Sequence, residues 1–171
     1  KYISDIIEKI KNDKELTEEE KKLYTEDKIK NMKVSIDFIK RDINRTFYTD
    51  FFTKEGGIEQ LNNILERMCA VPGNVGYCQG MNFIVCILYE IYGEEEAFYI
   101  FLSFFKSTEY PKIFAKDLHK LKIFFYDFNR ILQLLEPELS SYLIMRNATV
   151  DVFLPLWFIT LFTSSHQHLR I

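Results

Sequence analysis

The chain has 171 residues, of which 47% are hydrophobic and 27% charged, and its formal net charge is −3. This length and hydrophobic content suit one globular domain with a substantial core, and they exclude a disordered chain. The slightly acidic balance argues against a nucleic-acid partner, because binding to phosphates needs a basic surface.

The first thirty or so residues are charged and modestly amphipathic, which predicts a peripheral helical segment. Within it, Thr17 is followed by three glutamates. A hydroxyl that can cap backbone N–H groups, together with acidic residues in the first turn, favours a helix N-terminus at this point.

A narrow apolar stripe predicts the next helix, from Met32 to Phe47. The stripe consists of Met32, Ile36, Ile39, Ile43 and Phe47. At about 100° per residue, Asp42 falls on the flank of this stripe and Arg45 nearly opposite its centre. We therefore expect Arg45 to face outward.

A connector with two glycines precedes a predicted helix from Ile58 to Ala70, which ends before a loop that contains proline and glycine. The mostly apolar segment from Met81 to Tyr92 is too long for a typical strand. It predicts a central helix that is buried on nearly all sides.

Further helices follow. Acidic residues 94–96 start one whose buried face holds Ala97, Phe98, Phe101, Phe104 and Phe105, and which ends near Pro111. A seam formed by Leu118, Leu121, Phe125, Phe128, Leu132 and Leu135 covers fewer than three heptads, and so favours a long core helix over a coiled coil. A short helix through Leu143 and a last one from Val152 to Phe162 complete an all-α domain of seven to nine helices without a sheet.

The usual signatures of a self-contained active site are missing from the sequence. It has no HExxH, P-loop, EF-hand or GxSxG motif. His119 stands alone, and His166 and His168 lack further ligands nearby, so no metal site is predicted. The two longest uncharged runs are interrupted by prolines, glycines or polar residues, and no transmembrane helix is predicted.

The three cysteines are Cys69, Cys78 and Cys86. Their odd number and the absence of CxxC spacing predict buried free thiols in a reducing compartment. Cys78 has no neighbouring basic residue or histidine to lower its pKa, and so we expect it to be inert rather than nucleophilic.

Two polar residues remain as candidates, Arg45 and Gln79. Arg45 follows Asp42 by one turn, which by itself is typical of a solvated helix face. Gln79 lies in the segment GYCQG, where glycines allow the backbone to turn and to approach another surface closely. Alone, that pattern is more often a capped helix start than a functional site.

Together the two residues belong to an ordered pair of motifs. IKRDINR, at residues 39–45, fits IxxDxxR, and GYCQGMN, at residues 76–82, fits YxQGMN. With EEEAF and LWFITLF further on, the chain resembles the TBC domain of Rab GTPase-activating proteins from about Met32 to Phe162, within a single domain assigned to residues 1–171.

There are two departures from the family pattern. The only tryptophan is Trp157, so the Arg and Trp motif that many members carry on an earlier helix is absent. Family domains also commonly continue for several helices after LWFITLF. We therefore expect an incomplete domain.

The resemblance implies an all-helical protein that accelerates GTP hydrolysis by Rab-type GTPases. Arg45 would be the arginine finger and Gln79 the glutamine finger, while GTP and Mg²⁺ belong to the partner. The chain would then need no cofactor and have no turnover of its own. The expected supporting residues are Ile39 and Asp42 for the arginine, and Tyr77, Gly80, Met81 and Asn82 for the glutamine loop. Gly76 and Gly80 would let that loop meet the GTPase surface.

The implied partner is a GTP-bound Rab, and the implied location is cytoplasmic or peripheral on endomembranes, with membrane contact only through the lipid anchor of the Rab. Two alternatives stay open. One is a TBC-like scaffold that binds a GTPase or another partner without stimulating hydrolysis. The other is an unrelated helical adaptor, in which Arg45 and Gln79 are ordinary surface residues.

Overall fold

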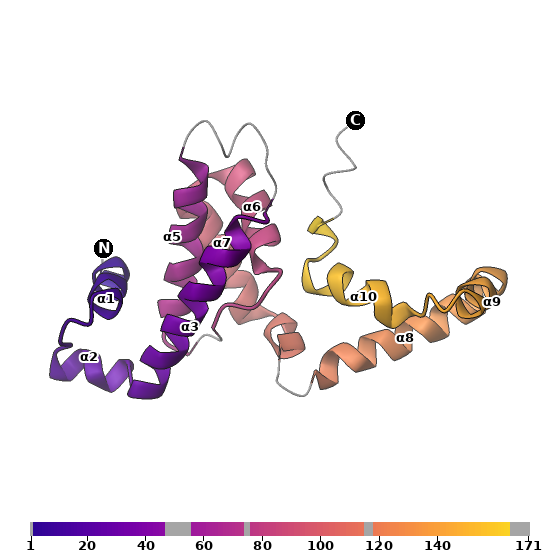
Figure 1. Cartoon of the computed structure of the whole chain (residues 1–171), viewed down its shortest axis with the longest axis horizontal. Helices are drawn as coiled ribbons and strands as arrows, with labels where there is room; N and C mark the ends of the chain where they lie inside the picture. Colours follow the sequence, from indigo (N-terminus) through magenta and orange to yellow (C-terminus); the bar gives the residue numbers. More distant parts are fainter. Residues whose placement is uncertain (1, 47–55, 74–75, 115–117, 165–171) are drawn as a thin grey trace. The chain divides into compact units, whose positions relative to one another are not determined.

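The computed structural model describes residues 2–46, 56–73, 76–114 and 118–164. These ranges contain nine α-helices, one 3-10 helix and no strand, which confirms the all-α prediction (Figure 1). The chain forms two compact units, residues 1–106 and 107–171. A single domain over residues 1–171 stays a prediction.

The first unit is organised around one helix, α5. Its helices are α1 (Tyr2–Lys11), α2 (Glu18–Leu23), α3 (Glu26–Ile43), α5 (Gly57–Ala70), α6 (Met81–Tyr92) and α7 (Glu94–Ser107). α5 packs against α1, α3 and α6. Leu61, Ile64 and Leu65 on α5 are at most 1% exposed, because their spacing places them on one helix face. Burying each such side chain contributes about 1.5–3 kcal/mol.

The N-terminal helices are less peripheral than the sequence predicts. Three isoleucines of α1, Ile6, Ile7 and Ile10, are at most 5% exposed and join one apolar cluster with Tyr24 and Met32. Isoleucines spaced by one and three residues are enough to give this ten-residue helix a core-facing side. The many charged residues of the segment make that side hard to recognise in the sequence.

The predicted start of α2 is confirmed. Thr17 Oγ1 accepts a hydrogen bond from the Glu20 amide at 3.3 Å, and a Glu20 carboxylate oxygen accepts one from the Thr17 amide at 2.8 Å. This reciprocal pair is a capping box, which satisfies backbone donors at the helix N-terminus.

α3 buries the predicted stripe. Met32, Ile36, Ile39 and Ile43 are at most 7% exposed. The helix ends at Ile43, earlier than predicted, and Phe47 lies outside the described residues. The reason for the early end is the turn that carries Arg45, described below.

The bounds of α6 agree with the prediction, but its burial is one-sided. Ile84, Val85 and Cys86 are buried, whereas Ile87 and Leu88 are half-exposed.

The next helix, α7, starts at Glu94 as expected and buries Ala97, Phe98, Phe101 and Phe105, while Phe104 is half-exposed. It ends at Ser107 rather than near Pro111. The Thr108 hydroxyl accepts a hydrogen bond from the Tyr110 amide at 3.2 Å and turns the chain there.

The second unit is organised around α8 (His119–Leu135). The 3-10 helix η1 (Tyr110–Phe114), α9 (Pro137–Met145) and α10 (Val150–Ile159) all contact it. Of the predicted seam on α8, Leu121 is buried, three residues are partly buried, and Leu118 and Leu135 are exposed. The prediction of a long helix is confirmed, but its placement in the core holds for only part of the length.

Within the described ranges, no single helix has both the length and the hydropathy to cross a membrane. α9 and α10 pass that test only when they are taken together, and the pair is bent by 113°.

Replacing Ile39 by alanine should destabilise the protein by about 2–4 kcal/mol, because a completely buried side chain would leave a cavity. The free energy of unfolding, measured in urea by circular dichroism, checks this. Val34→Ala on the same helix is the matched control, since Val34 is 47% exposed, and should change stability by no more than about 0.5 kcal/mol. Equal losses in the two variants would contradict the assigned faces of α3.

Candidate functional site

Arg45 lies in a tight turn just after the end of α3. The Arg45 amide donates to the Asp42 carbonyl at 3.0 Å, and the Thr46 amide donates to the Ile43 carbonyl at 3.0 Å. The Asn44 side-chain amide donates to the Lys40 carbonyl at 3.3 Å. These bonds satisfy carbonyls that a helix C-terminus leaves without partners, and they end α3 before Arg45.

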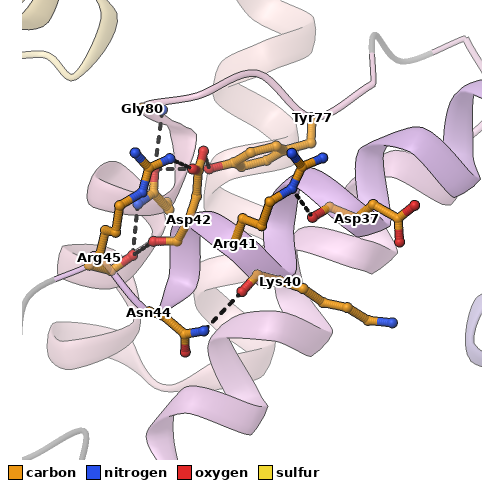
Figure 2. Close-up of polar contacts among 10 residues, drawn as sticks. Asp37, Lys40, Arg41, Asp42, Asn44, Arg45, Tyr77 and Gly80 are labelled. Carbon is orange, nitrogen blue, oxygen red and sulfur yellow. Dashed lines mark hydrogen bonds and ion pairs between the residues drawn. The ribbon is translucent and has the colours of Figure 1, made fainter.

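The Asp42 carboxylate supports this turn from the buried side. Asp42 as a residue is 4% exposed, and one of its carboxylate oxygens pairs with the Arg45 guanidinium. Its other oxygen accepts a hydrogen bond from the Tyr77 hydroxyl at 2.9 Å. Figure 2 shows Arg45 and Tyr77 both meeting Asp42. A buried carboxylate is tolerated only when it is paired and hydrogen-bonded, and this one is both.

Arg45 combines a backbone that is fixed in a turn with a guanidinium that is accessible. Its side chain is 65% exposed, in contrast to the 6% of the Asp42 side chain. A guanidinium carries five N–H donors, so pairing with Asp42 leaves several that can reach a bound anion. The prediction that Arg45 faces outward is confirmed, although it does so from a turn rather than from the helix.

Tyr77 links the arginine turn to the glutamine loop. Its hydroxyl lies 2.9 Å from Asp42 Oδ2 and 3.0 Å from Asn82 Oδ1. Burial and, after it, the Asp42 carboxylate raise the pKa of Tyr77 well above its usual value. The hydroxyl therefore keeps its single proton, for which Asp42 Oδ2 and Asn82 Oδ1 are the two acceptors.

Gln79 occupies the outer part of a tight turn that starts α6. The Met81 amide donates to the Cys78 carbonyl at 3.2 Å and closes the turn. Gly80, at the third position, has a φ of 106°, a left-handed conformation that glycine adopts without strain. Gln79 is exposed, while Gly80 and Met81 on its C-terminal side are buried. The turn thus presents one neutral amide side chain on a buried support.

Gly76 is required by packing inside the unit. The Tyr77 amide donates to Ser35 Oγ on α3 at 3.0 Å. A Cβ added at Gly76 would lie 2.6 Å from that same oxygen, closer than real Cβ contacts occur. The structure therefore adds a reason for Gly76 that the sequence did not show, which is the close approach to α3, while its predicted role toward a GTPase stays a prediction.

All eight predicted site residues lie within the described part of the chain. Asp42, Tyr77 and Asn82 are brought into one hydrogen-bonded group with Arg45, and the Gly80 amide donates to Asn82 Oδ1 at 3.1 Å. Met81 Sδ accepts from the Cys78 amide at 3.4 Å, inside the turn. Ile39 is fully buried one turn before Asp42. Their roles toward a partner stay predictions.

Sequence reasoning missed two residues of this group, Ser35 and Thr46. Ser35 sits among the apolar stripe positions of α3 and is 5% exposed, and a polar residue on a buried face calls for a partner. Thr46 follows the end of a helix, where a hydroxyl can bond to a carbonyl four residues back. Both signals were present in the sequence.

Other candidates for chemistry are weaker in the structure. Burial raises the pKa of the Cys69 thiol to about 12 and that of the Cys78 thiol to about 11, which suppresses the nucleophilic thiolate. The three cysteines form no disulfide, and in the described ranges no three His, Cys, Asp or Glu side chains are grouped as a metal ion would require. His166 and His168 lie outside the described residues.

The arrangement suits an anion whose charge is spread over several oxygens. Arg45 supplies a permanent positive charge with planar donors. Gln79 supplies a neutral group that both donates and accepts hydrogen bonds. These two side chains come from segments far apart in the sequence. The hydrogen bonds of Asp42, Tyr77 and Asn82 join the two segments.

Comparison with known proteins gives one family. The model of the Rab-GTPase-TBC domain family matches residues 1–169. The human ecotropic viral integration site 5 protein homolog is 32% identical over 130 residues, which cover 74% of this chain and 16% of that protein. GTPase-activating protein GYP5 of Eremothecium gossypii is 31% identical over 72% of this chain and 15% of its own length. Rab GTPase-activating protein eat-17 of Caenorhabditis elegans is 30% identical over 74% and 14%. The chain thus spans under a fifth of the length of these curated relatives.

Tyr77→Phe should lower the free energy of unfolding by about 1–3 kcal/mol, because it leaves a buried Asp42 oxygen without its donor. Chemical denaturation measures the change. Tyr99→Phe is the control, since Tyr99 is 57% exposed, and it should be nearly neutral. If both variants were equally stable, the buried hydrogen bond from Tyr77 to Asp42 would make no net contribution to the free energy of unfolding.

Cys69 and Cys78 should react slowly with iodoacetamide at pH 8 in the folded protein. Their raised pKa values mean that both thiols stay protonated at this pH, and the thiolate is the reacting form. Mass spectrometry of peptides from native and urea-unfolded samples compares the rates. Alkylation of Cys78 as fast in the native as in the unfolded chain would contradict the raised pKa, and faster alkylation in the native chain would show an activated nucleophile.

Proposed function

Because the chain belongs to the Rab-GTPase-TBC domain family, we propose that it stimulates GTP hydrolysis by a Rab small GTPase, with Arg45 and Gln79 entering the nucleotide site of the partner. The observation that carries the proposal is the shared buried support. The Asp42 carboxylate binds Arg45 and, through Tyr77, the segment that holds Gln79.

The proposed role of Arg45 follows from the chemistry of phosphoryl transfer. The transition state spreads negative charge over the oxygens of the transferred group. A guanidinium with fixed planar donors stabilises that charge better than a hydrated ammonium. An arginine supplied by an activating protein accelerates the reaction by about 10³–10⁵-fold.

Gln79 acts on the attacking water in this proposal. Its amide can accept a hydrogen bond from the water through oxygen and donate one to another group through nitrogen, and it does both without adding charge. Because the turn from Cys78 to Met81 is closed by a backbone hydrogen bond, the side chain starts from a fixed point. Fixing a reacting group beforehand lowers the entropic cost of reaching the transition state.

The partner supplies the remaining parts. A GTP-bound Rab holds the nucleotide and its Mg²⁺, so this chain contributes side chains to a reaction and has no turnover of its own. A lipid-anchored Rab would also bring the chain to endomembranes without an anchor in residues 1–171. These statements belong to the same proposal.

Phosphate release from a panel of GTP-loaded Rab proteins tests the proposal under single-turnover conditions. With the responsive Rab, Arg45→Lys and Gln79→Ala should each lower the maximal rate by about 10²-fold or more, because each removes a group that acts only in the transition state. Arg41→Lys is the matched control. Arg41 is an exposed arginine of α3 that donates to the Asp37 carbonyl (Figure 2). Its guanidinium also stacks on Phe38.

Two results would count against the proposal. If no Rab in the panel responds although the folded chain binds one, the chain is a scaffold rather than an activator. If Arg41→Lys lowers the maximal rate as much as Arg45→Lys, the assignment of the arginine finger is wrong.

A further inference from the structure

Thr46 has no assigned role, yet its side chain lies at the junction of the two candidate segments. It follows Arg45 directly and is 5% exposed. Its hydroxyl donates to the Asp42 carbonyl at 2.9 Å and accepts from Asn82 Nδ2 at 2.7 Å. The single proton of the hydroxyl is therefore used, and its oxygen receives a second bond.

The orientation of the Asn82 amide follows from its three partners, which are the Gly80 amide, the Tyr77 hydroxyl and the Thr46 hydroxyl. The Gly80 amide can only donate, and so it must meet the oxygen of Asn82, at 3.1 Å. The amide nitrogen then faces Thr46, whose own proton is committed to the Asp42 carbonyl. Asn82 is 1% exposed, so no solvent is at hand to replace a lost partner.

These bonds form a continuous path between the two segments. The path runs from the Asp42 carbonyl through Thr46 and Asn82 to the amide of Gly80, the residue after Gln79. The bond from Tyr77 to the Asp42 carboxylate holds the other side of the turn, two residues before Gln79. Gln79 is thus held on both sides, and each tie leads back to Asp42.

We propose that Thr46 is a positioning residue that, through Asn82, fixes the Gln79 turn relative to Arg45. This inference rests on the proposed function, because it concerns how the two side chains reach one nucleotide site together. Without the Thr46 path, these connections between the loop and Asp42 would all pass through the Tyr77 hydroxyl, which meets both the Asp42 carboxylate and Asn82 Oδ1.

A pair of substitutions separates the hydroxyl from the shape of Thr46. Thr46→Val keeps the branched shape and removes the donor and acceptor, which leaves the buried Asn82 nitrogen without its partner. Thr46→Ser keeps the hydroxyl. Thr160→Val is a control for losing a buried threonine hydroxyl elsewhere, because Thr160 is 0% exposed and bonds to the Leu156 carbonyl in the second unit.

Hydrogen exchange of the Gly80 amide, followed by NMR, tests the connection without any GTPase. Thr46→Val should speed this exchange about tenfold, because Asn82, which accepts from that amide, loses its bond to Thr46 and keeps only the one to Tyr77. Thr46→Ser and Thr160→Val should leave it unchanged. Unchanged exchange in Thr46→Val would overturn the inference, whatever the activity.

Single-turnover hydrolysis with a responsive Rab tests the consequence. Thr46→Val should lower the maximal rate about tenfold and leave the half-saturating concentration unchanged, whereas Thr46→Ser restores the rate. In the Gln79→Ala background, Thr46→Val should lower the maximal rate by a smaller factor than in the wild type, because the side chain that Thr46 positions is gone. The same factor in both backgrounds would show a merely structural role and overturn the inference.

The two assays separate the failures. Faster exchange of Gly80 together with a lower maximal rate supports the inference. Faster exchange with an unchanged maximal rate overturns the positioning role while the proposed function stands. If the wild type activates no Rab, the proposed function fails and the positioning role in catalysis fails with it, while the exchange data still decide whether Thr46 holds the turn.

Discussion

The candidate site depends on the contacts of one buried group, the carboxylate of Asp42. Its two oxygens bind Arg45 and Tyr77, and its backbone carbonyl receives the Thr46 hydroxyl. A buried carboxylate is costly unless it is paired and hydrogen-bonded, so the contacts of Asp42 stabilise one another. The end of α3 and the turn before α6 are consequently stabilised together, and the two exposed side chains depend on one buried group.

This arrangement places buried, stabilising residues next to the two exposed candidate residues. Ile39 anchors α3 in the core, and Asn82 and Met81 anchor the first turn of α6. Arg45 and Gln79 project from these supports and are exposed. Groups that are held in place before a partner arrives lose less conformational entropy on binding, and so more of the interaction energy can act on the transition state.

Much of this site could be predicted from local patterns. The apolar stripe of α3 placed Ile39 inside and Arg45 outside, and the apolar run after Gly80 gave the bounds of α6. Periodicity could not show that α3 ends at Ile43, because side chains bonding to carbonyls decide that end. Nor could it show why residue 76 is a glycine, since the reason is the distant Ser35 on α3. Long-range polar contacts leave no periodic trace in a single sequence.

The most direct test of the account is single-turnover GTP hydrolysis by a responsive Rab with Asp42→Asn. The substitution keeps the size of the side chain and removes the charge that holds Arg45, so binding of the partner should be unaffected while both side chains lose their common support. We expect the maximal rate to fall at least about tenfold at an unchanged half-saturating concentration. A folded Asp42→Asn chain with the wild-type maximal rate would contradict the claim that this carboxylate positions the catalytic pair.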